Sequence, residues 1–229
     1  MSVQTIVPAA GAGTRLKSEK PKALVDLGGK PLLVRTLLRL QKAGIAEDVI
    51  VLAPPDNLDL FQEVLEGAGL DFRWRLVPGG SERQISVSRG IEALPSHVEW
   101  VVIHDAARPF VPVNCIHQAL EAARAVGAAT VAIPCTDTIL VADSDCFLVE
   151  TPERKHLWAC QTPQVFRVDI IVEAHRWATE HRFLATDDAT LVRSLGNPVR
   201  LVMGSTLNFK ITTPTDLLMA GLLIERGFV

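Results

Sequence analysis

The chain has 229 residues, of which 48% are hydrophobic, and its formal net charge is −3 at pH 7. This composition is typical of a globular protein, and at this length about 70% of the unfolded surface can be buried on folding. The small negative charge argues against general nucleic-acid binding, and no apolar run reaches the roughly 18 residues needed to span a membrane.

The N-terminus and the cysteines indicate a cytoplasmic protein. The first residues lack the basic segment and the long apolar core of a signal peptide. The four cysteines, Cys115, Cys135, Cys146 and Cys160, are scattered and form no C-x-x-C pair. We therefore expect reduced thiols, with neither a disulfide framework nor a cysteine metal site.

The first predicted element is a strand at 5–7, which leads into the stretch P-A-A-G-A-G-T-R…P-K at 8–22. Glycine allows tight turns and close approach of the backbone to a ligand. A turn between a strand and a helix also presents N–H groups to an anion. Four basic residues against one acid at 15–22 add a local excess of positive charge. The stretch therefore predicts a polyphosphate-binding loop.

Two common glycine motifs do not fit this loop. A Walker A motif requires a Gly-Lys-Ser/Thr ending, which is absent. The dinucleotide fingerprint requires a third small residue where Leu16 stands and an acid about twenty residues later, and Asp26 comes too early. The structural alternative is a tight turn with solvated lysines, which does not account for Arg15 or for Pro21-Lys22.

The next segments alternate between predicted helices and strands. Apolar residues at helical spacing predict a helix from Pro31 to about Gly44. It is followed by a strand at 48–52, a helix at 58–65, an extended segment at 72–77, a helix at 86–94, a strand at 100–103, a helix at 113–126 and a strand at 129–133. Apolar strands separated by helices indicate a Rossmann-like, three-layer α/β fold with a mostly parallel sheet.

Three polar clusters fall at the carboxyl ends of predicted strands, at 8–22, 78–86 and 104–109. Ligands of open α/β sheets bind beyond these strand ends. We therefore expect the three clusters to converge on one site.

The alternation of strand and helix breaks after Pro134. Apolar runs at 138–141 and 147–150 flank a polar tip and predict a protruding β-hairpin. A two-stranded hairpin is marginal by itself, so the arm at about 135–160 is expected to lean on a partner subunit. Beyond it we expect helices at 169–181 and 187–194, strands at 199–203 and 209–211, and a closing helix after Pro214.

Asp105 directly follows an apolar strand, so its carboxylate is expected at the edge of the sheet. Mg²⁺ prefers one or two carboxylates together with substrate phosphates. A metal or substrate role is favoured over capping of the next turn, because Arg108 and Pro109 lie close behind. His104 is expected to be a packed residue, since nothing near it in sequence supplies a partner for base catalysis.

Several other polar positions keep two interpretations. Lys210 fits a solvated strand residue as well as a functional one, and Arg154 would ordinarily be a surface residue. The start of a helix at 186–188 accounts for Asp188, while Thr186 stays a candidate for contact with a ligand.

Six segments together resemble the 2-C-methyl-D-erythritol 4-phosphate cytidylyltransferase family of the non-mevalonate isoprenoid pathway. They are the glycine loop at 8–22, P-G-G-S-E-R…S-V at 78–87, H-D-A-A-R-P at 104–109, L-W-A-C-Q-T-P-Q at 157–164, T-D-D-A at 186–189 and N-F-K-I-T-x-P-x-D-L at 208–217. The match runs in order from end to end. Six segments in this order are far more specific than any one of them.

The resemblance implies a single nucleotidyltransferase domain over 1–229, with CTP and 2-C-methyl-D-erythritol 4-phosphate as substrates and Mg²⁺ as cofactor. It also implies a homodimer in which arm residues, Arg154 among them, complete the neighbouring site. The residues implied to bind CTP are Ala9, Ala10, Gly11, Ala12, Gly13, Gly80, Ser81 and Ser86. Those implied to bind the polyol phosphate are Asp105, Ala106, Arg108, Thr162 and Thr186, with Asp105 also the metal ligand. The implied catalytic residues are Arg15 and Lys22, which stabilise the transition state, and Arg154 and Lys210, which position the attacking phosphate.

Two positions depart from the family's usual pattern. Ile85 stands where a polar residue is common, and Cys135-Thr136 where a basic one is common. Three other functions are weighed: a ribitol 5-phosphate cytidylyltransferase, a nucleotide-binding regulatory module without catalysis, and a nicotinamide dehydrogenase. The missing third glycine counts against the last of these.

Overall fold

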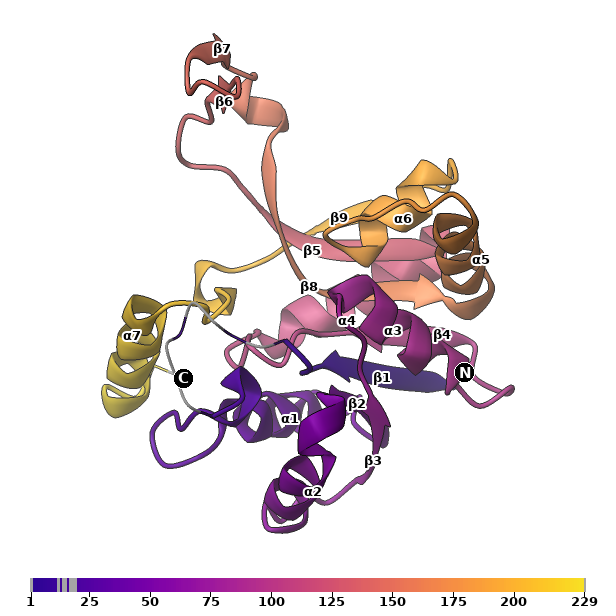
Figure 1. Ribbon diagram of the computed structural model, residues 1–229, viewed down its shortest axis with the longest axis vertical. Helices are drawn as coiled ribbons and strands as arrows, with labels where there is room; N and C mark the ends of the chain where they lie inside the picture. Colours follow the sequence, from indigo (N-terminus) through magenta and orange to yellow (C-terminus); the bar gives the residue numbers. More distant parts are fainter. Residues whose placement is uncertain (1, 12, 14–15, 17–19, 229) are drawn as a thin grey trace.

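The computed structural model describes residues 2–11, 13, 16 and 20–228. The main strands are β1 (Val3–Pro8), β2 (Asp48–Ala53), β3 (Arg73–Pro78), β4 (Trp100–Ile103), β5 (Ala128–Pro134), β8 (Trp158–Arg167) and β9 (Arg200–Met203). The α-helices are α1 (Leu32–Lys42), α2 (Leu58–Glu66), α3 (Arg83–Glu92), α4 (Val113–Val126), α5 (Val168–Glu180), α6 (Asp188–Ser194) and α7 (Pro214–Glu225). Within the described residues, the strands form one seven-stranded sheet in the order β3-β2-β1-β4-β8-β5-β9 (Figure 1).

The sheet is mostly parallel, as the apolar strands predicted. Strand β1 pairs in parallel with β2 and β4, β2 with β3, and β5 with β9. Strand β8 is antiparallel to both of its neighbours, β4 and β5. Because β8 reverses direction between them, β4 and β5 point the same way. The carboxyl ends of β1, β3, β4, β5 and β9 therefore share one edge of the sheet.

Strand β8 was not among the strands predicted from the sequence, and it contains Pro163. A proline lacks the N–H that a central strand donates. The pairing with β5 is irregular at this point: Thr130 is opposite Gln164, whereas Ala132 is opposite Cys160. Three residues of β8, Pro163 among them, thus lie opposite one residue of β5. A proline is tolerated in such a bulge because the ladder is already interrupted.

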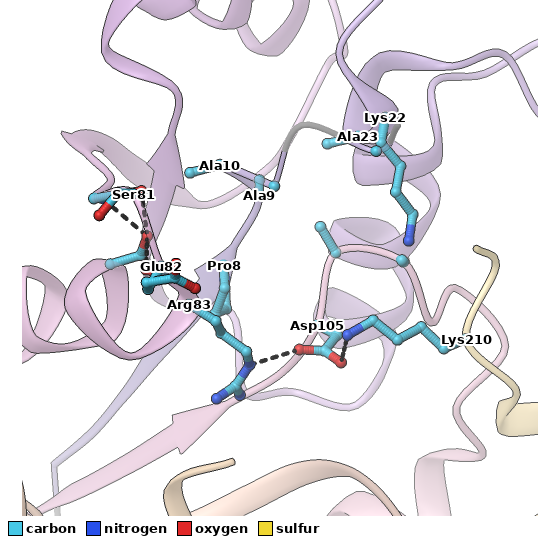
Figure 2. A pocket seen from close by; sticks show the side chains of 16 residues that line it. Pro8, Ala9, Ala10, Lys22, Ala23, Ser81, Glu82, Arg83, Asp105 and Lys210 are labelled. Atoms are coloured by element: carbon cyan, nitrogen blue, oxygen red, sulfur yellow. Dashed lines mark hydrogen bonds and ion pairs between the residues drawn. The ribbon is translucent and has the colours of Figure 1, made fainter. Parts of the chain in front are cut away.

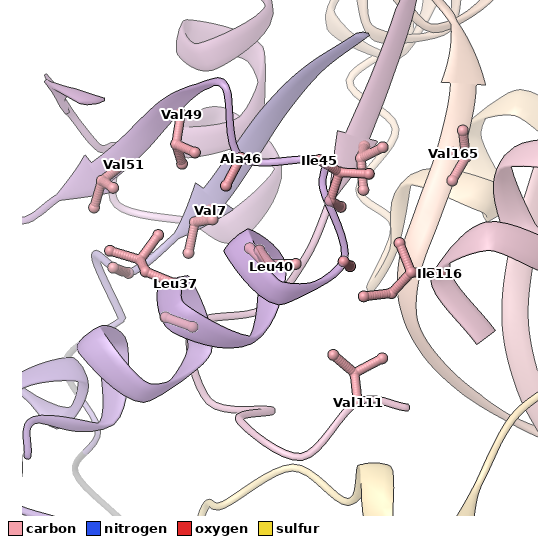
Figure 3. Packing of buried hydrophobic residues seen from close by; sticks show 14 of the residues in the cluster. Val7, Leu37, Leu40, Ile45, Ala46, Val49, Val51, Val111, Ile116 and Val165 are labelled. Atoms are coloured by element: carbon pink, nitrogen blue, oxygen red, sulfur yellow. The ribbon is translucent and has the colours of Figure 1, made fainter. Parts of the chain in front are cut away.

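Helices cover both faces of the sheet, so the predicted three layers are confirmed. On one face, Val7, Val49 and Val51 point toward Leu37 and Leu40 of α1 (Figure 3), and α2 and α4 pack on the same face. On the other face, the alternate strand residues pack against α3, α5 and α6. The inner strands β1, β2 and β4 are therefore buried on both sides, which explains their continuous apolar sequences. The edge strands β3 and β9 are partly exposed.

The predicted strand at 209–211 is wrong. The chain there follows a 3₁₀ turn (Thr206–Asn208) and runs extended toward α7 without joining the sheet. Ile211 is fully buried in a small apolar cluster with Leu32, Phe110 and Ala220. The segment that carries Lys210 is thus fixed by packing, with no strand partners.

The predicted hairpin is present as β6 (Val141–Ala142) and β7 (Leu148–Glu150), which pair in antiparallel fashion. It stands at the tip of a long arm that projects from the body of the molecule (Figure 1). The arm leaves at the end of β5 and returns at the start of β8, so it grows from the same edge of the sheet as the glycine loops. No helix in the described part of the chain is long and apolar enough to cross a membrane.

Candidate active site

The polar clusters at the carboxyl edge surround a cleft of about 400 Å³ (Figure 2). One wall is the loop after β1, and the opposite wall is the second glycine loop with the start of α3. The floor is formed by residues 105–107 after β4, and Lys22 and Lys210 complete the lining. The three polar clusters that follow the carboxyl ends of strands therefore converge on one cleft, as expected.

Two glycines allow the walls to come together. A Cβ on Gly79 would lie 2.4 Å from the Cβ of Ala10, so the two loops touch at a distance that only glycine permits. Gly13 has a φ of +63°, and a Cβ there would lie 2.3 Å from the Cβ of Lys22. Close packing therefore requires glycine at positions 13 and 79, whether or not these residues contact a ligand.

Ser86 shapes the second loop from inside. Its buried hydroxyl accepts a hydrogen bond from the Gly80 N–H at 3.0 Å and donates to the Glu82 carbonyl at 3.0 Å. The loop is therefore held in place by its own helix, with Gly80 and Ser81 facing the cleft.

Asp105 is the anionic centre of the cleft. Its Oδ2 lies 2.9 Å from Lys210 Nζ and 3.5 Å from Arg108 Nε, and its Oδ1 lies 3.3 Å from Arg83 Nε. Burial by itself would raise the pKa of Asp105, but the charges of Arg83, Lys210 and Arg108 outweigh it and hold the pKa well below its ordinary value. Asp105 is therefore a carboxylate, and its side chain does not cap the following turn.

A chain of hydrogen bonds fixes Asp105 from behind. Its backbone N–H donates to Thr162 Oγ1 at 3.0 Å, and that hydroxyl lies 3.0 Å from His104 Nδ1. His104 Nε2 lies 3.0 Å from the Arg108 carbonyl, which can only accept, so we assign the ring proton to Nε2. Burial lowers the pKa of His104 to about 4. The histidine is thus a neutral, packed residue, as expected.

Lys210 is directed into the cleft by its neighbours. Asn208, fully buried, donates from Nδ2 to the Thr162 carbonyl at 2.8 Å and accepts at its own carbonyl from Arg108 Nη1 at 2.7 Å. The Ile211 N–H donates to the Ala107 carbonyl at 2.9 Å. Lys210 therefore stands between two anchored residues and is a cleft residue.

The structure brings most of the predicted site residues together. Those that line the cleft are Ala9, Ala10, Gly11, Gly13, Lys22, Gly80, Ser81, Ser86, Asp105, Ala106 and Lys210. Ala12 and Arg15 lie outside the described residues. Arg108 and Thr162 are buried behind the floor. Thr186, which is exposed, and Arg154, on the arm, are not among the lining residues in the described part of the chain.

Sequence reasoning selected neither Arg83, which lines the cleft, nor Asp188, which pairs with Arg83 behind it. Arg83 stands in the quoted segment P-G-G-S-E-R and lines the cleft, where it contacts Asp105 (Figure 2). The sequence analysis explained Asp188 as part of a helix start. The helix start is confirmed: α6 begins at Asp188, and Asp187 caps it by accepting a hydrogen bond from the Thr190 N–H at 3.0 Å. The long-range contact of Asp188 with Arg83 leaves no local pattern in the sequence.

Two carboxylates are among the described lining residues, Asp105 and Glu82, and Asp105 is the one predicted from the sequence as a metal ligand. Among the described residues no group of three or more His, Cys, Asp or Glu side chains could hold a metal. One ionised carboxylate beside a loop predicted to bind phosphate nevertheless suits Mg²⁺, which takes most of its other ligands from substrate phosphates and water.

Taken with the fold, two glycine loops and a cationic cleft at the carboxyl edge of the sheet define a nucleotidyltransferase of Rossmann-like architecture. A model of the IspD family, 2-C-methyl-D-erythritol 4-phosphate cytidylyltransferase, matches residues 3–226. The chain belongs to this family.

Individual relatives agree over nearly the full length. The 2-C-methyl-D-erythritol 4-phosphate cytidylyltransferase of Caldanaerobacter subterraneus subsp. tengcongensis is 42% identical, over 99% of this chain and 100% of its own. The crystal structure of the Anaerococcus prevotii 4-diphosphocytidyl-2C-methyl-D-erythritol synthase superposes with a TM-score of 0.86 at 29% identity, over 98% of this chain and 99% of its own. The crystal structure of the Thermus thermophilus 2-C-methyl-D-erythritol 4-phosphate cytidylyltransferase superposes with a TM-score of 0.79 at 35% identity, over 98% of this chain and 100% of its own.

Proposed function

We propose that this chain joins CTP and 2-C-methyl-D-erythritol 4-phosphate, giving 4-diphosphocytidyl-2-C-methyl-D-erythritol and pyrophosphate in the non-mevalonate isoprenoid pathway, and that the cleft is its active site. The observation that carries the assignment of the site is the meeting of Lys22, Asp105 and Lys210 beside two glycine loops. These residues come from three segments far apart in the sequence.

The chemical difficulty of this reaction is electrostatic. The nucleophile is a phosphate monoester whose second pKa is about 6, so it is largely a dianion near neutral pH and needs no general base. It must approach an anionic triphosphate. Phosphoryl-type transfer is accelerated mainly by positioning and by stabilisation of charge. The neutral, buried His104 fits this scheme, because no proton has to be removed.

Each side of the cleft has a part in this scheme. The backbone of Ala9–Gly13 binds the triphosphate, and Gly80, Ser81 and Ser86 bound the space for the base and ribose. Lys22, with Arg15, stabilises charge at the α-phosphate and the departing pyrophosphate. Lys210 holds the attacking phosphate in line. A Mg²⁺ ion held by Asp105 and the substrate phosphates would supply further charge neutralisation.

The arm supports a homodimer. Among its side chains, Leu140, Phe147, Leu148 and Val149 are 59–70% exposed, a concentration of apolar surface typical of an interface. Arg154 begins the 3₁₀ turn Arg154–His156 of this arm and donates to the Thr136 carbonyl at 3.0 Å. We propose that the arm of one protomer brings Arg154 to the polyol-phosphate side of the partner's cleft, and that the dimer acts in the cytoplasm.

The test is pyrophosphate release from CTP with each polyol phosphate in parallel. Turnover with 2-C-methyl-D-erythritol 4-phosphate and little with ribitol 5-phosphate is expected. Binding of CTP without turnover on either would instead indicate a regulatory module. Lys22→Ala is expected to lower kcat by orders of magnitude in a folded protein, and unchanged turnover would remove Lys22 from the mechanism.

A further inference from the structure

Two buried carboxylates from distant parts of the chain share one arginine. Arg83, the first residue of α3, places Nε 3.3 Å from Asp105 Oδ1 and Nη1 2.7 Å from Asp188 Oδ2. Asp188, at the start of α6, is 1% exposed. The guanidinium therefore connects the floor of the cleft with the helical layer behind it.

His175 of α5 holds Asp188 from the other side. Its Nε2 lies 3.1 Å from Asp188 Oδ1, and an ionised carboxylate can only accept, so Nε2 carries the proton. The Asp188 N–H donates to Gln164 Oε1 at 3.0 Å. Burial by itself would raise the pKa of Asp188, but Arg83 and His175 outweigh it and lower the pKa. Asp188 is therefore a fixed anion whose two oxygens are both engaged.

This arrangement bears on Lys210 through Asp105. Lys210 Nζ is paired with Asp105 Oδ2 at 2.9 Å, whereas Arg83 occupies Oδ1. To bind a substrate phosphate, Lys210 must give up part of its interaction with Asp105. A cation held on Oδ1 neutralises Asp105 and so weakens its attraction for Lys210. If Arg83 moved away, Asp105 would compete more strongly with the phosphate.

We propose that Asp188 and His175 are positioning residues, which hold Arg83 on Asp105 and thereby leave Lys210 able to bind the phosphate of the polyol substrate. The identity of that phosphate rests on the proposed function. Neither residue lines the cleft, so both act through Arg83, which is the group that contacts Asp105.

The test compares four variants of this chain by steady-state kinetics and by calorimetric binding of each substrate. Asp188→Asn keeps the shape but removes the charge, and Arg83→Lys keeps a charge but cannot reach both carboxylates in a fork. Both are expected to raise KM for 2-C-methyl-D-erythritol 4-phosphate about tenfold, the effect of about 1.4 kcal/mol. In Asp188→Asn, whose side chain does not line the cleft, KM for CTP should stay within about twofold. His175→Leu should give a smaller shift, and His175→Gln, which can still donate, should restore the wild-type value.

The matched control is Asp169→Asn. Asp169 is an exposed carboxylate in the first turn of α5, and it pairs with Arg167 at 2.6 Å. Its KM values should equal those of the wild type. A purely structural role for Asp188 would lower the urea midpoint and leave both KM values unchanged, and that result would overturn the proposal.

The wild-type chain separates the two proposals. If it neither turns over nor binds 2-C-methyl-D-erythritol 4-phosphate, the proposed function fails and the positioning role fails with it. If the wild type is active and Asp188→Asn and Arg83→Lys keep its KM for that substrate, the positioning role alone is wrong.

Discussion

Replacement of Gly79 by alanine tests whether the contact between the two glycine loops shapes the cleft. The added Cβ would lie 2.4 Å from the Cβ of Ala10, 3.1 Å from Ser86 Oγ and 3.3 Å from the Ala53 carbonyl oxygen. Non-bonded carbon atoms prefer about 3.5–4.0 Å, so the two loops must separate by about 1 Å or more. A misplacement of about 1 Å can cost about 100-fold in rate, and overpacking costs about 1–3 kcal/mol of stability.

We therefore expect Gly79→Ala to lower kcat/KM for CTP about 100-fold while the protein stays folded. The assay is pyrophosphate release at varied CTP, with urea unfolding measured alongside. Gly221→Ala is the matched control, because a Cβ at this position in α7 has nothing within 4 Å. That variant should keep full activity and gain up to about 1 kcal/mol from the helix propensity of alanine.

A second substitution separates steric from other effects. Ala10→Gly in the Gly79→Ala background removes the closest atom and should recover much of the lost kcat/KM. A folded Gly79→Ala enzyme with wild-type kcat/KM for CTP would refute the reasoning, and so would a double variant no better than the single one.

Three further predictions concern His104, the hydroxyl of Thr162 and dimerisation through the arm. Burial lowers the pKa of His104 to about 4 in the native protein. Between about pH 6.5 and 4, His104 therefore binds a proton in the unfolded chain but stays neutral in the native protein. The free energy of unfolding should therefore fall as the pH drops from about 6.5 to 4, and a flat profile in urea titrations would contradict this. Thr162→Val removes the hydroxyl between His104 and the Asp105 N–H and should cost about 1–3 kcal/mol, whereas Thr162→Ser should be milder. Phe147→Asp on the arm should shift sedimentation from dimer to monomer, while Phe228→Asp, at a side chain equally exposed at 70%, should leave it unchanged.

Local pattern determined the layers of the fold and the position of the cleft. Continuous apolar strands can be buried only between two layers of helices, and the polar residues that follow them, such as Asp105, must then lie at the carboxyl edge. The predicted boundaries of α4 and β4 agree with the structure for this reason. Lys22 could be selected because it lies within the loop whose composition suggested a phosphate.

Only the tertiary structure decided the direction of β8 and the partners of the buried charges. Strand β8 was not among the predicted strands, and the bulge that accommodates Pro163 exists only in the pairing with β5. Arg83 meets Asp105 and Asp188 across sequence separations of 22 and 105 residues. Such pairs leave no periodicity or spacing in the sequence, because ion-pair energy depends on distance and burial in space.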